Sequence, residues 1–133
     1  MRNEEKSLLL KDLCARLPYG VQCKYNRIFP IGWEVSDPST DGTLQSIEIE
    51  TSGSINVKID GRLHGLSDFK PYLRPMSSMT EEERNEYENF ITNEKDDQLR
   101  FCNESVFYNR HHLDYWGLIP MGLALPATED MYK

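Results

Sequence analysis

Residues 46–60 read Ser-Ile-Glu-Ile-Glu-Thr-Ser-Gly-Ser-Ile-Asn-Val-Lys-Ile-Asp and carry the clearest β pattern of the chain. Apolar and polar residues alternate on both sides of a Thr-Ser-Gly-Ser turn. The apolar positions are Ile47, Ile49, Ile55, Val57 and Ile59. A period of two is typical of a strand that buries one face. Two such runs joined by a short turn predict an antiparallel hairpin.

Further strands are expected on both sides of this hairpin. An Asp-Gly dipeptide follows it and favours a tight turn, so residues 62–66 are predicted to return as a third strand. Residues 21–26 alternate in the same way and predict another strand. Residues 36–43 are rich in Ser, Asp, Pro and Gly and should form a loop. Residues 68–75 hold two prolines, which predicts an extended segment at an edge or leaving the sheet.

The N-terminal residues 4–17 have the spacing of an amphipathic helix. Apolar side chains recur at i, i+3, i+4 and i+7. They are Leu10, Leu13, Cys14 and Leu17. Asn3 can cap the start of this helix, and Pro18 with Gly20 should end it.

Two more helices are expected in the second half of the chain. Thr-Glu-Glu-Glu at residues 80–83 is a capping box and marks a helix start. The buried stripe of this helix is predicted at Tyr87, Phe90 and Ile91. The charged residues 93–98 should be solvated, and a shorter helix should begin near Ser105 and end at Gly117. Its apolar side is predicted at Val106, Leu113 and Trp116.

Together these elements predict an α+β fold in a single domain spanning residues 1–133. Residues 1–19 are the N-terminal helix, 20–75 the β-rich part, and 76–133 the helical part and tail. The β-rich part is expected to form a small antiparallel sheet or a partly open SH3-like barrel. The apolar residues 118–125 could pack on this sheet or across a homo-oligomer.

Composition excludes several classes of function. Acidic residues outnumber basic ones by 22 to 15, a net charge of −7, so nucleic acid is not expected as a direct partner. No apolar stretch approaches the length of about 18 residues that a membrane span needs. The first residues lack the apolar region of a signal peptide. We therefore expect a cytoplasmic protein without membrane contact.

Catalytic and metal-binding patterns are also missing from the sequence. The three cysteines, Cys14, Cys23 and Cys102, form no C-x-x-C pair and are expected to be free, small buried side chains. Adjacent helical residues diverge by about 100°, so His111 and His112 are not expected to share a metal. In a helix, Tyr108, one of these histidines and Tyr115 would share a face. No metal and no cofactor are predicted.

Aromatic residues in irregular segments are the best candidates for a binding surface. They are Tyr19, Phe29, Trp33, Tyr72, Tyr115, Trp116 and Tyr132. Pro71 and Pro75 stiffen the backbone around Tyr72 and Arg74, which lowers the entropy cost of binding. The candidate interface combines Tyr72 and Arg74 with six residues of the aromatic and polar segment 108–116. The eight residues are Tyr72, Arg74, Tyr108, Arg110, His111, His112, Tyr115 and Trp116.

Three segments of the chain together resemble a known family. They are Leu-Cys-Ala-Arg-Leu-Pro-Tyr-Gly-Val at 13–21, Lys-Pro-Tyr-Leu-Arg-Pro-Met-Ser-Ser-Met-Thr-Glu-Glu-Glu at 70–83, and His-His-Leu-Asp-Tyr-Trp-Gly-Leu-Ile at 111–119 with Gly-Leu-Ala-Leu at 122–125. The family consists of small uncharacterised proteins carried by prophages and related mobile elements of anaerobic gut bacteria. The resemblance implies a bacterial host cell and supplies no catalytic chemistry.

Three classes of function follow from this context. The first is a non-enzymatic accessory protein of a phage or mobile element that acts by protein–protein contact, in which the acidic charge suits a basic partner. The second is a small-ligand binder such as a sponge for a nucleotide signal, with Arg74, Arg110 and His111 or His112 on the phosphates. The third is an enzyme that uses His111 or His112. The first is the preferred hypothesis.

Overall fold

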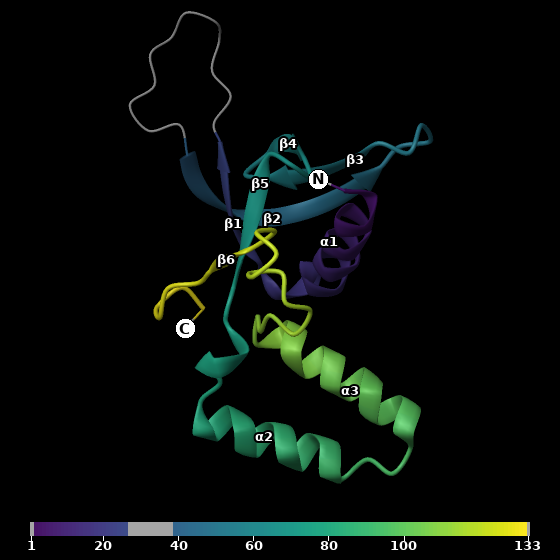
Figure 1. Ribbon diagram of the computed structural model, residues 1–133, viewed down its shortest axis with the longest axis vertical. Helices are drawn as coiled ribbons and strands as arrows, with labels where there is room; N and C mark the ends of the chain where they lie inside the picture. Colours follow the sequence, from purple (N-terminus) through teal and green to yellow (C-terminus); the bar gives the residue numbers. More distant parts are fainter. Residues whose placement is uncertain (1, 27–38, 133) are drawn as a thin grey trace, which may run out of the picture.

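The computed structural model describes residues 2–26 and 39–132, apart from the side chains of Asn26 and Ser39. This part of the chain contains an N-terminal helix, a six-stranded sheet and two C-terminal helices (Figure 1), which confirms the predicted α+β class. Three predictions fall outside the described residues. They concern Phe29, Trp33 and the first part of the loop expected at 36–43.

The elements follow one another along the chain as helix, strands, helices and a last short strand. In order they are α1 (Asn3–Arg16), the 3-10 turn η1 (Leu17–Tyr19), β1 (Gln22–Asn26), β2 (Ser39–Ile49), β3 (Ile55–Ile59), β4 (Arg62–Gly65), β5 (Phe69–Leu73), the 3-10 turn η2 (Met76–Ser78), α2 (Glu81–Thr92), α3 (Asp97–Arg110) and β6 (Leu125–Pro126). Gly20 follows η1 with a φ of 73°, so the predicted end of the first helix region at Pro18 and Gly20 is confirmed.

The sheet is open, with the strand order β4-β3-β2-β1-β5-β6. All neighbouring pairs are antiparallel except β5 and β6. The predicted hairpin is β2 and β3, in which Ile47 lies opposite Val57 and Ile49 opposite Ile55. The strand expected after the Asp-Gly turn is β4. Of the two predicted architectures, the structure therefore has the small, mostly antiparallel sheet.

Residues 39–43, expected in a loop, belong to β2 and pair with β1. Gly42 lies opposite Cys23 in this register, and a Cβ built on Gly42 would collide with the Asp60 carboxylate. That carboxylate accepts hydrogen bonds from the Tyr25 hydroxyl at 3.0 Å and the Thr43 amide at 3.4 Å. Gly42 therefore lets the Asp60 side chain approach the backbone of β2 closely and does not form a turn. The loop prediction was wrong because it interpreted this glycine as a turn residue.

Residues 69–73 form β5, which is inside the sheet and not at its edge. The strand is antiparallel to β1, with Pro71 opposite Cys23, and parallel to β6 on its other side. β6 pairs only with Tyr72 and Leu73. Pro71 has no N–H to donate, and the short β6 leaves it without a ladder partner on that side. An interior proline is tolerated for this reason.

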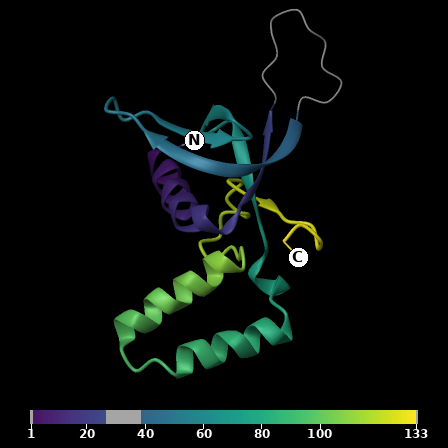
Figure 2. The same cartoon turned by 180° about the vertical axis from the view of Figure 1, so that it is seen from behind.

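The core lies between one face of the sheet and α1, which covers that face (Figure 2). Leu118, Leu123 and Ala124 of the C-terminal segment pack into the same core. Residues 118–125 therefore cover the molecule's own sheet, one of the two arrangements that the sequence left open. The fully buried side chains of α1 are Leu9, Asp12, Leu13 and Arg16.

The buried face of α1 differs from the predicted one. Of the predicted stripe only Leu13 is fully buried, and Cys14 is exposed. The helix is rotated toward Leu9 because Asp12 and Arg16 neutralise each other on the buried side. The predicted cap is also wrong: Asn3 is the first residue of α1, and the Arg2 carbonyl accepts the first helical bond, from the Lys6 amide at 3.0 Å.

The capping box that starts α2 is confirmed. The Glu83 amide donates to the Thr80 hydroxyl at 3.1 Å, and the Thr80 amide donates to the Glu83 carboxylate at 3.0 Å. No residue of α2 is buried, however, and Phe90 is 36% exposed. The predicted buried stripe is wrong because α2 and α3 form a hairpin that stands away from the sheet (Figures 1 and 2).

The last helix begins and ends earlier than predicted. α3 begins at Asp97 and is capped by Asp96, whose carboxylate accepts from the amides of Gln98 at 2.9 Å and Leu99 at 3.1 Å. The charged run 93–98 is thus part loop and part helix start. α3 ends at Arg110, and the positive φ of His112, 60°, turns the chain away.

The predicted apolar side of the last helix is only partly buried. Leu113 is fully buried, whereas Val106 and Trp116 are exposed, and Phe107 is the large buried residue of α3. Because the helix ends at Arg110, His111, His112 and Tyr115 do not continue its faces. The expected shared helical face of these residues with Tyr108 is therefore wrong.

Cysteine burial also departs from expectation. All three cysteines are free, but Cys14 and Cys102 are exposed. Cys23 is buried in the sheet, and this burial raises the pKa of its thiol to about 12. Of the three, only Cys23 is the small buried side chain that was predicted.

No helix in the described part of the chain is long and apolar enough to cross a membrane.

Candidate functional site

Arg74, just after β5, directs its guanidinium into the molecule. It forms a bidentate ion pair with the Glu83 carboxylate, in which both N–O distances are 2.7 Å. It also donates to the carbonyl oxygens of Ser78 at 3.0 Å and His111 at 3.3 Å. Arg74 therefore connects the sheet to η2, to α2 and to the end of α3.

The Arg74–Glu83 pair is the centre of a chain of ionic contacts. Hydrogen bonds from Arg74, and then from Thr80, hold the pKa of Glu83 at about 2 against the opposing effect of burial. His111 Nδ1 lies 3.0 Å from the Glu83 carboxylate, and Arg110 lies 2.6 Å from the Glu86 carboxylate. We call this group the ionic cluster. Its members are Arg74, Glu83, Glu86, Arg110 and His111.

His112 contacts the C-terminal segment. Its ring stacks on Tyr132, with centroids 3.7 Å apart and planes at 7°. Its carbonyl accepts a hydrogen bond from the Arg74 amide at 2.7 Å. Burial, followed by the nearby charges of Arg16, Arg74 and His111, lowers the pKa of His112 to about 4. The imidazole is therefore neutral at physiological pH.

A buried ion pair in α1 supports the segment that follows α3. Arg16 donates to the Asp12 carboxylate at 2.8 Å and to the Leu113 carbonyl oxygen at 2.6 Å. Burial raises the pKa of Asp12, although Arg16 acts in the opposite direction. The Arg16 guanidinium also lies over the Tyr115 ring, 5.4 Å from its centroid. Asp12 and Arg16 therefore fix the backbone and ring on which the candidate interface depends.

Asp114 holds the turn that carries the chain back to the sheet. Its carboxylate accepts hydrogen bonds from the backbone amides of Leu118 at 2.7 Å and Ile119 at 3.0 Å. Its own amide donates to the Arg74 carbonyl oxygen at 2.8 Å. The segment 111–119 is thus tied to β5 by its backbone and to itself by Asp114.

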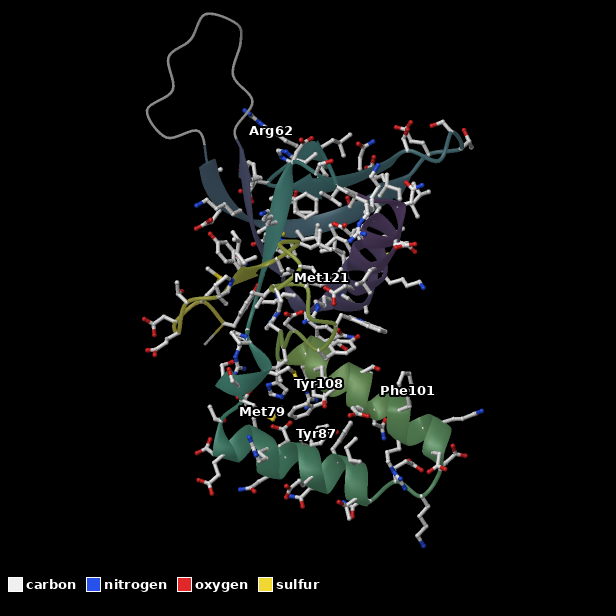
Figure 3. The ribbon with its side chains drawn as sticks, in the orientation of Figure 1. Arg62, Met79, Tyr87, Phe101, Tyr108 and Met121 are labelled. Atoms are coloured by element: carbon white, nitrogen blue, oxygen red, sulfur yellow. The ribbon has the colours of Figure 1, made fainter. Side chains whose placement is uncertain are left out.

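Four aromatic rings follow one another from α2 to the segment after α3. Tyr87 and Tyr108 stack with centroids 5.6 Å apart, and Tyr108 and Tyr115 stack at 5.2 Å. Trp116 adjoins Tyr115 at 5.2 Å, with planes tilted by 36°. Figure 3 shows Tyr87 and Tyr108 in the space between α2 and α3. We call this group the aromatic column.

Part of the aromatic column lines a pocket of about 330 Å³ beside α3. We call it the α3 pocket. Its lining residues are Met76, Phe101, Glu104, Ser105, Tyr108, Tyr115 and Trp116. Three of them are apolar and exposed: Phe101 is 66% exposed, Trp116 46% and Met76 36%. Figure 3 shows Phe101 on the side of α3 that faces away from α2.

Tyr72 lies on the face of the sheet opposite the core. It belongs neither to the ionic cluster nor to the aromatic column. Its hydroxyl donates to the Asp41 carboxylate at 2.8 Å, and burial together with this bond raises the pKa of Tyr72 to about 12. Its carbonyl oxygen accepts from the Tyr132 hydroxyl at 2.7 Å. Tyr72 therefore anchors β2 and the C-terminal segment to β5.

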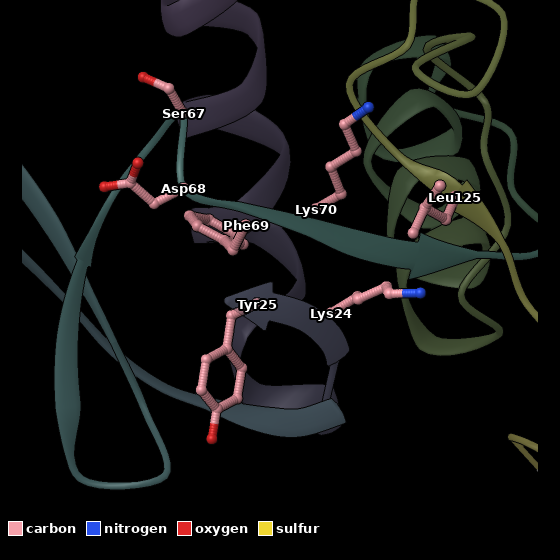
Figure 4. Close-up of a pocket in the computed structure, with 7 residues that line it drawn as sticks. All are labelled: Lys24, Tyr25, Ser67, Asp68, Phe69, Lys70 and Leu125. Carbon is pink, nitrogen blue, oxygen red and sulfur yellow. The ribbon is translucent and has the colours of Figure 1, made fainter. Parts of the chain in front are cut away.

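Two further hollows lie near the sheet. One, of about 170 Å³, is lined in part by Lys24, Lys70 and Leu125 (Figure 4). Lys24 and Lys70 are direct cross-strand neighbours of β1 and β5. The other, of about 630 Å³, lies between the Arg74–Glu83 pair and the C-terminal residues 127–132. Both mix acidic with basic side chains and give no clear signal for one ligand.

The structure divides the eight predicted site residues among four places. Tyr108, Tyr115 and Trp116 line the α3 pocket. Arg74, Arg110 and His111 belong to the ionic cluster. His112 stacks on Tyr132, and Tyr72 lies on the outer face of the sheet. The predicted interface residues thus belong to different groups of contacts.

Sequence reasoning missed several residues of this region. The pocket residues are Met76, Phe101, Glu104 and Ser105, and the supporting pair is Asp12 and Arg16. The i, i+4 spacing of Asp12 and Arg16 on the side of Leu9 and Leu13 was a usable signal for a buried pair. No comparable signal marked Phe101, because residues 93–104 were not assigned to a helix.

Nothing in the described residues points to a metal centre: no group of three or more His, Cys, Asp or Glu side chains there could hold a metal ion.

Comparison of the chain with protein-family models, with curated proteins and with solved structures finds no match. The resemblance to prophage proteins therefore stays a prediction. The site has to be interpreted from its own geometry.

Proposed function

We propose that this chain is a non-enzymatic protein that acts by contact with another protein, and that the α3 pocket is its contact surface. The observation that carries the proposal is the exposure of large apolar side chains around a formed pocket, above all Phe101 and Trp116. Clustered exposed apolar residues commonly mark interaction sites. Rings held in place before binding lose little entropy on binding.

α3 also exposes two apolar side chains outside the pocket lining. Leu99 is 53% exposed and Val106 is 42% exposed. The helix hairpin stands away from the sheet (Figure 1), and the exposed side chains of Phe101 and Trp116 leave the rim of the pocket open to a partner. An accessory role in a phage or mobile element agrees with the family resemblance and is part of this proposal.

The two alternative functions have less support. For a nucleotide, Arg74 and Arg110 already bind Glu83 and Glu86, and a phosphate would have to displace those carboxylates. For an enzyme, neither His111 nor His112 lines the α3 pocket. Both imidazoles instead make contacts that stabilise the fold.

The proposal can be tested by affinity purification from the native host cell, with the captured proteins identified by mass spectrometry. The wild-type chain is compared with the double variant Phe101→Ser, Trp116→Ala and with Leu63→Ser, which removes an exposed leucine, 48% accessible, from β4. We expect a partner retained by the wild type and by Leu63→Ser but lost with the pocket variant. Equal retention by all three, with unchanged thermal melting, would overturn the proposal.

A further inference from the structure

The α3 pocket contains one carboxylate among its rings, that of Glu104. The Tyr87 hydroxyl donates to it at 2.6 Å and the Tyr108 hydroxyl at 3.1 Å, both to Oε1. Burial, reinforced by hydrogen bonding to Glu104, raises the pKa of both tyrosines, so the two hydroxyls are neutral donors. They orient the carboxylate without cancelling its charge.

The negative charge of Glu104 has no counter-ion in the described part of the chain. No basic side chain of residues 2–26 or 40–132 lies within ion-pair distance of it. A carboxylate has about four acceptor positions, so it can accept further hydrogen bonds beside the two from the tyrosines. Glu104 is therefore an oriented and uncompensated anion in a partly apolar pocket.

The rings of the pocket also favour a cation. The face of an aromatic ring attracts Lys and Arg, with Trp the strongest ring, and Trp116 ends the aromatic column. The chain already makes this contact at Tyr115, a ring of the pocket, and at Phe90 of α2. Arg16 lies over the Tyr115 ring at 5.4 Å, and Arg110 lies over the Phe90 ring at 6.0 Å.

The surroundings of the pocket add a long-range attraction. Residues 76–110, which form the helix hairpin, contain nine acidic and four basic residues, a net charge of −5. Two of the four basic residues are already paired, Arg110 with Glu86 and Arg100 with Asp97. A surface of one dominant charge steers partners of the opposite charge toward it.

From these three observations we propose that the α3 pocket takes a Lys or Arg side chain from a basic segment of a partner protein, with Glu104 as its ion-pair acceptor and with large apolar residues of that segment on Phe101 and Trp116. The proposal rests on the proposed function and specifies the chemistry of the partner. An acidic side chain would meet Glu104 with like charge. A purely apolar one would remove Glu104 from water without a partner, which is costly.

Selection from a displayed library of random linear peptides tests this inference. The folded wild-type chain is the target, and the double variant Phe101→Ser, Trp116→Ala is used to remove peptides that bind elsewhere. We expect the enriched peptides to combine Lys or Arg with large apolar residues. Their affinity, measured by fluorescence polarisation, should fall as the salt concentration rises.

Glu104→Gln provides the sharper measurement, because the amide keeps an oxygen for both tyrosine hydroxyls and removes the charge. We expect the affinity for an enriched peptide to fall about tenfold in this variant. The matched control is Glu88→Gln, an exposed α2 residue outside the pocket lining, with a change below about twofold. Replacing the peptide's Arg by citrulline, or its Lys by norleucine, gives the same test on the unaltered protein.

The outcomes separate the two proposals. If the enriched peptides are neutral or acidic, and Glu104→Gln leaves their pocket-dependent binding unchanged, the cation inference fails while the contact function stands. If no peptide is enriched whose binding depends on Phe101 and Trp116, both proposals fail. Basic peptides that lose binding in Glu104→Gln but not in Glu88→Gln support both.

Discussion

Asp12 and Arg16 form an ion pair, one helical turn apart, in which both side chains are completely buried. Arg16 also donates to the Leu113 carbonyl oxygen at 2.6 Å, across 97 positions of sequence. One pair thus joins the first helix to the segment after the last one. Because charges are costly to bury, each partner depends on the other.

Removing one partner should therefore destabilise the protein strongly. Asp12→Ala leaves the Arg16 guanidinium buried without its carboxylate, and we expect a loss of about 3–5 kcal/mol in the free energy of unfolding. The double variant Asp12→Leu, Arg16→Met should lose less free energy of unfolding than Asp12→Ala, because it leaves no buried charge without a partner. Urea denaturation of the three proteins measures these differences.

The control for this prediction lies on the same helix. Arg2 and Glu5 also form an ion pair, but the Arg2 side chain is 80% exposed. Glu5→Ala should therefore change the free energy of unfolding by less than about 1 kcal/mol. If Asp12→Ala cost no more than Glu5→Ala, the assigned role of the buried pair would be wrong.

The same pair shows why part of the fold was predictable from sequence and part was not. The β2–β3 hairpin and the capping box of α2 depend on residues close in sequence, so their patterns predicted them correctly. The buried face of α1 depends on Asp12 and Arg16 pairing with each other. A pattern that counts both as polar turns them toward water and selects the wrong stripe.

The helix hairpin was difficult for a second physical reason. It is held by packing between α2 and α3, and side chains such as Leu99 and Phe101 stay exposed. Apolar periodicity therefore does not mark one buried stripe in α3. The pocket combines Met76 of η2 with residues of α3 and the segment after it. Sequence spacing could suggest Tyr108, Tyr115 and Trp116 as aromatic candidates but not the companions that the fold brings to them.

Acid should weaken the fold through Glu83. Its pKa in the folded protein is about 2, below the value near 4.3 of an unfolded chain. The stabilisation is therefore fully present above about pH 5 and is lost as the pH falls through 4 toward 2. Thermal melting of the wild type and of Glu83→Gln across this range should show the difference between them shrinking with acid. A constant difference would contradict the assigned ion pair with Arg74.

His112 should act at less acidic pH, beginning near pH 6.5 where Glu83 still contributes fully. Its pKa of about 4 in the folded protein lies below the value near 6.5 of an unfolded chain. The unfolded chain therefore binds the proton first, and stability should fall as the pH drops from about 6.5 to 4. His112→Asn tolerates the positive φ of this position, 60°, and should lack this decline. Melting curves that decline equally in both proteins would count against a buried neutral imidazole.

Lys24 and Lys70 offer a change that should stabilise the protein. They lie directly opposite each other on β1 and β5, and like charges in this position are unfavourable. Lys70→Glu turns the pair into an opposite-charge pair, and we expect a gain of about 0.2–1 kcal/mol in the free energy of unfolding. The gain should diminish in high salt, because both side chains are near solvent.

The matched control for this change is Lys58→Glu. Lys58 of β3 lies opposite Ser46 on one side and Leu63 on the other, so it has no directly opposed lysine. Lys58→Glu relieves no repulsion between opposed lysines, so it should not raise the free energy of unfolding to a comparable extent. Both variants lower the net charge by the same amount. A similar gain in both proteins would assign the effect to net charge and not to the contact between Lys24 and Lys70.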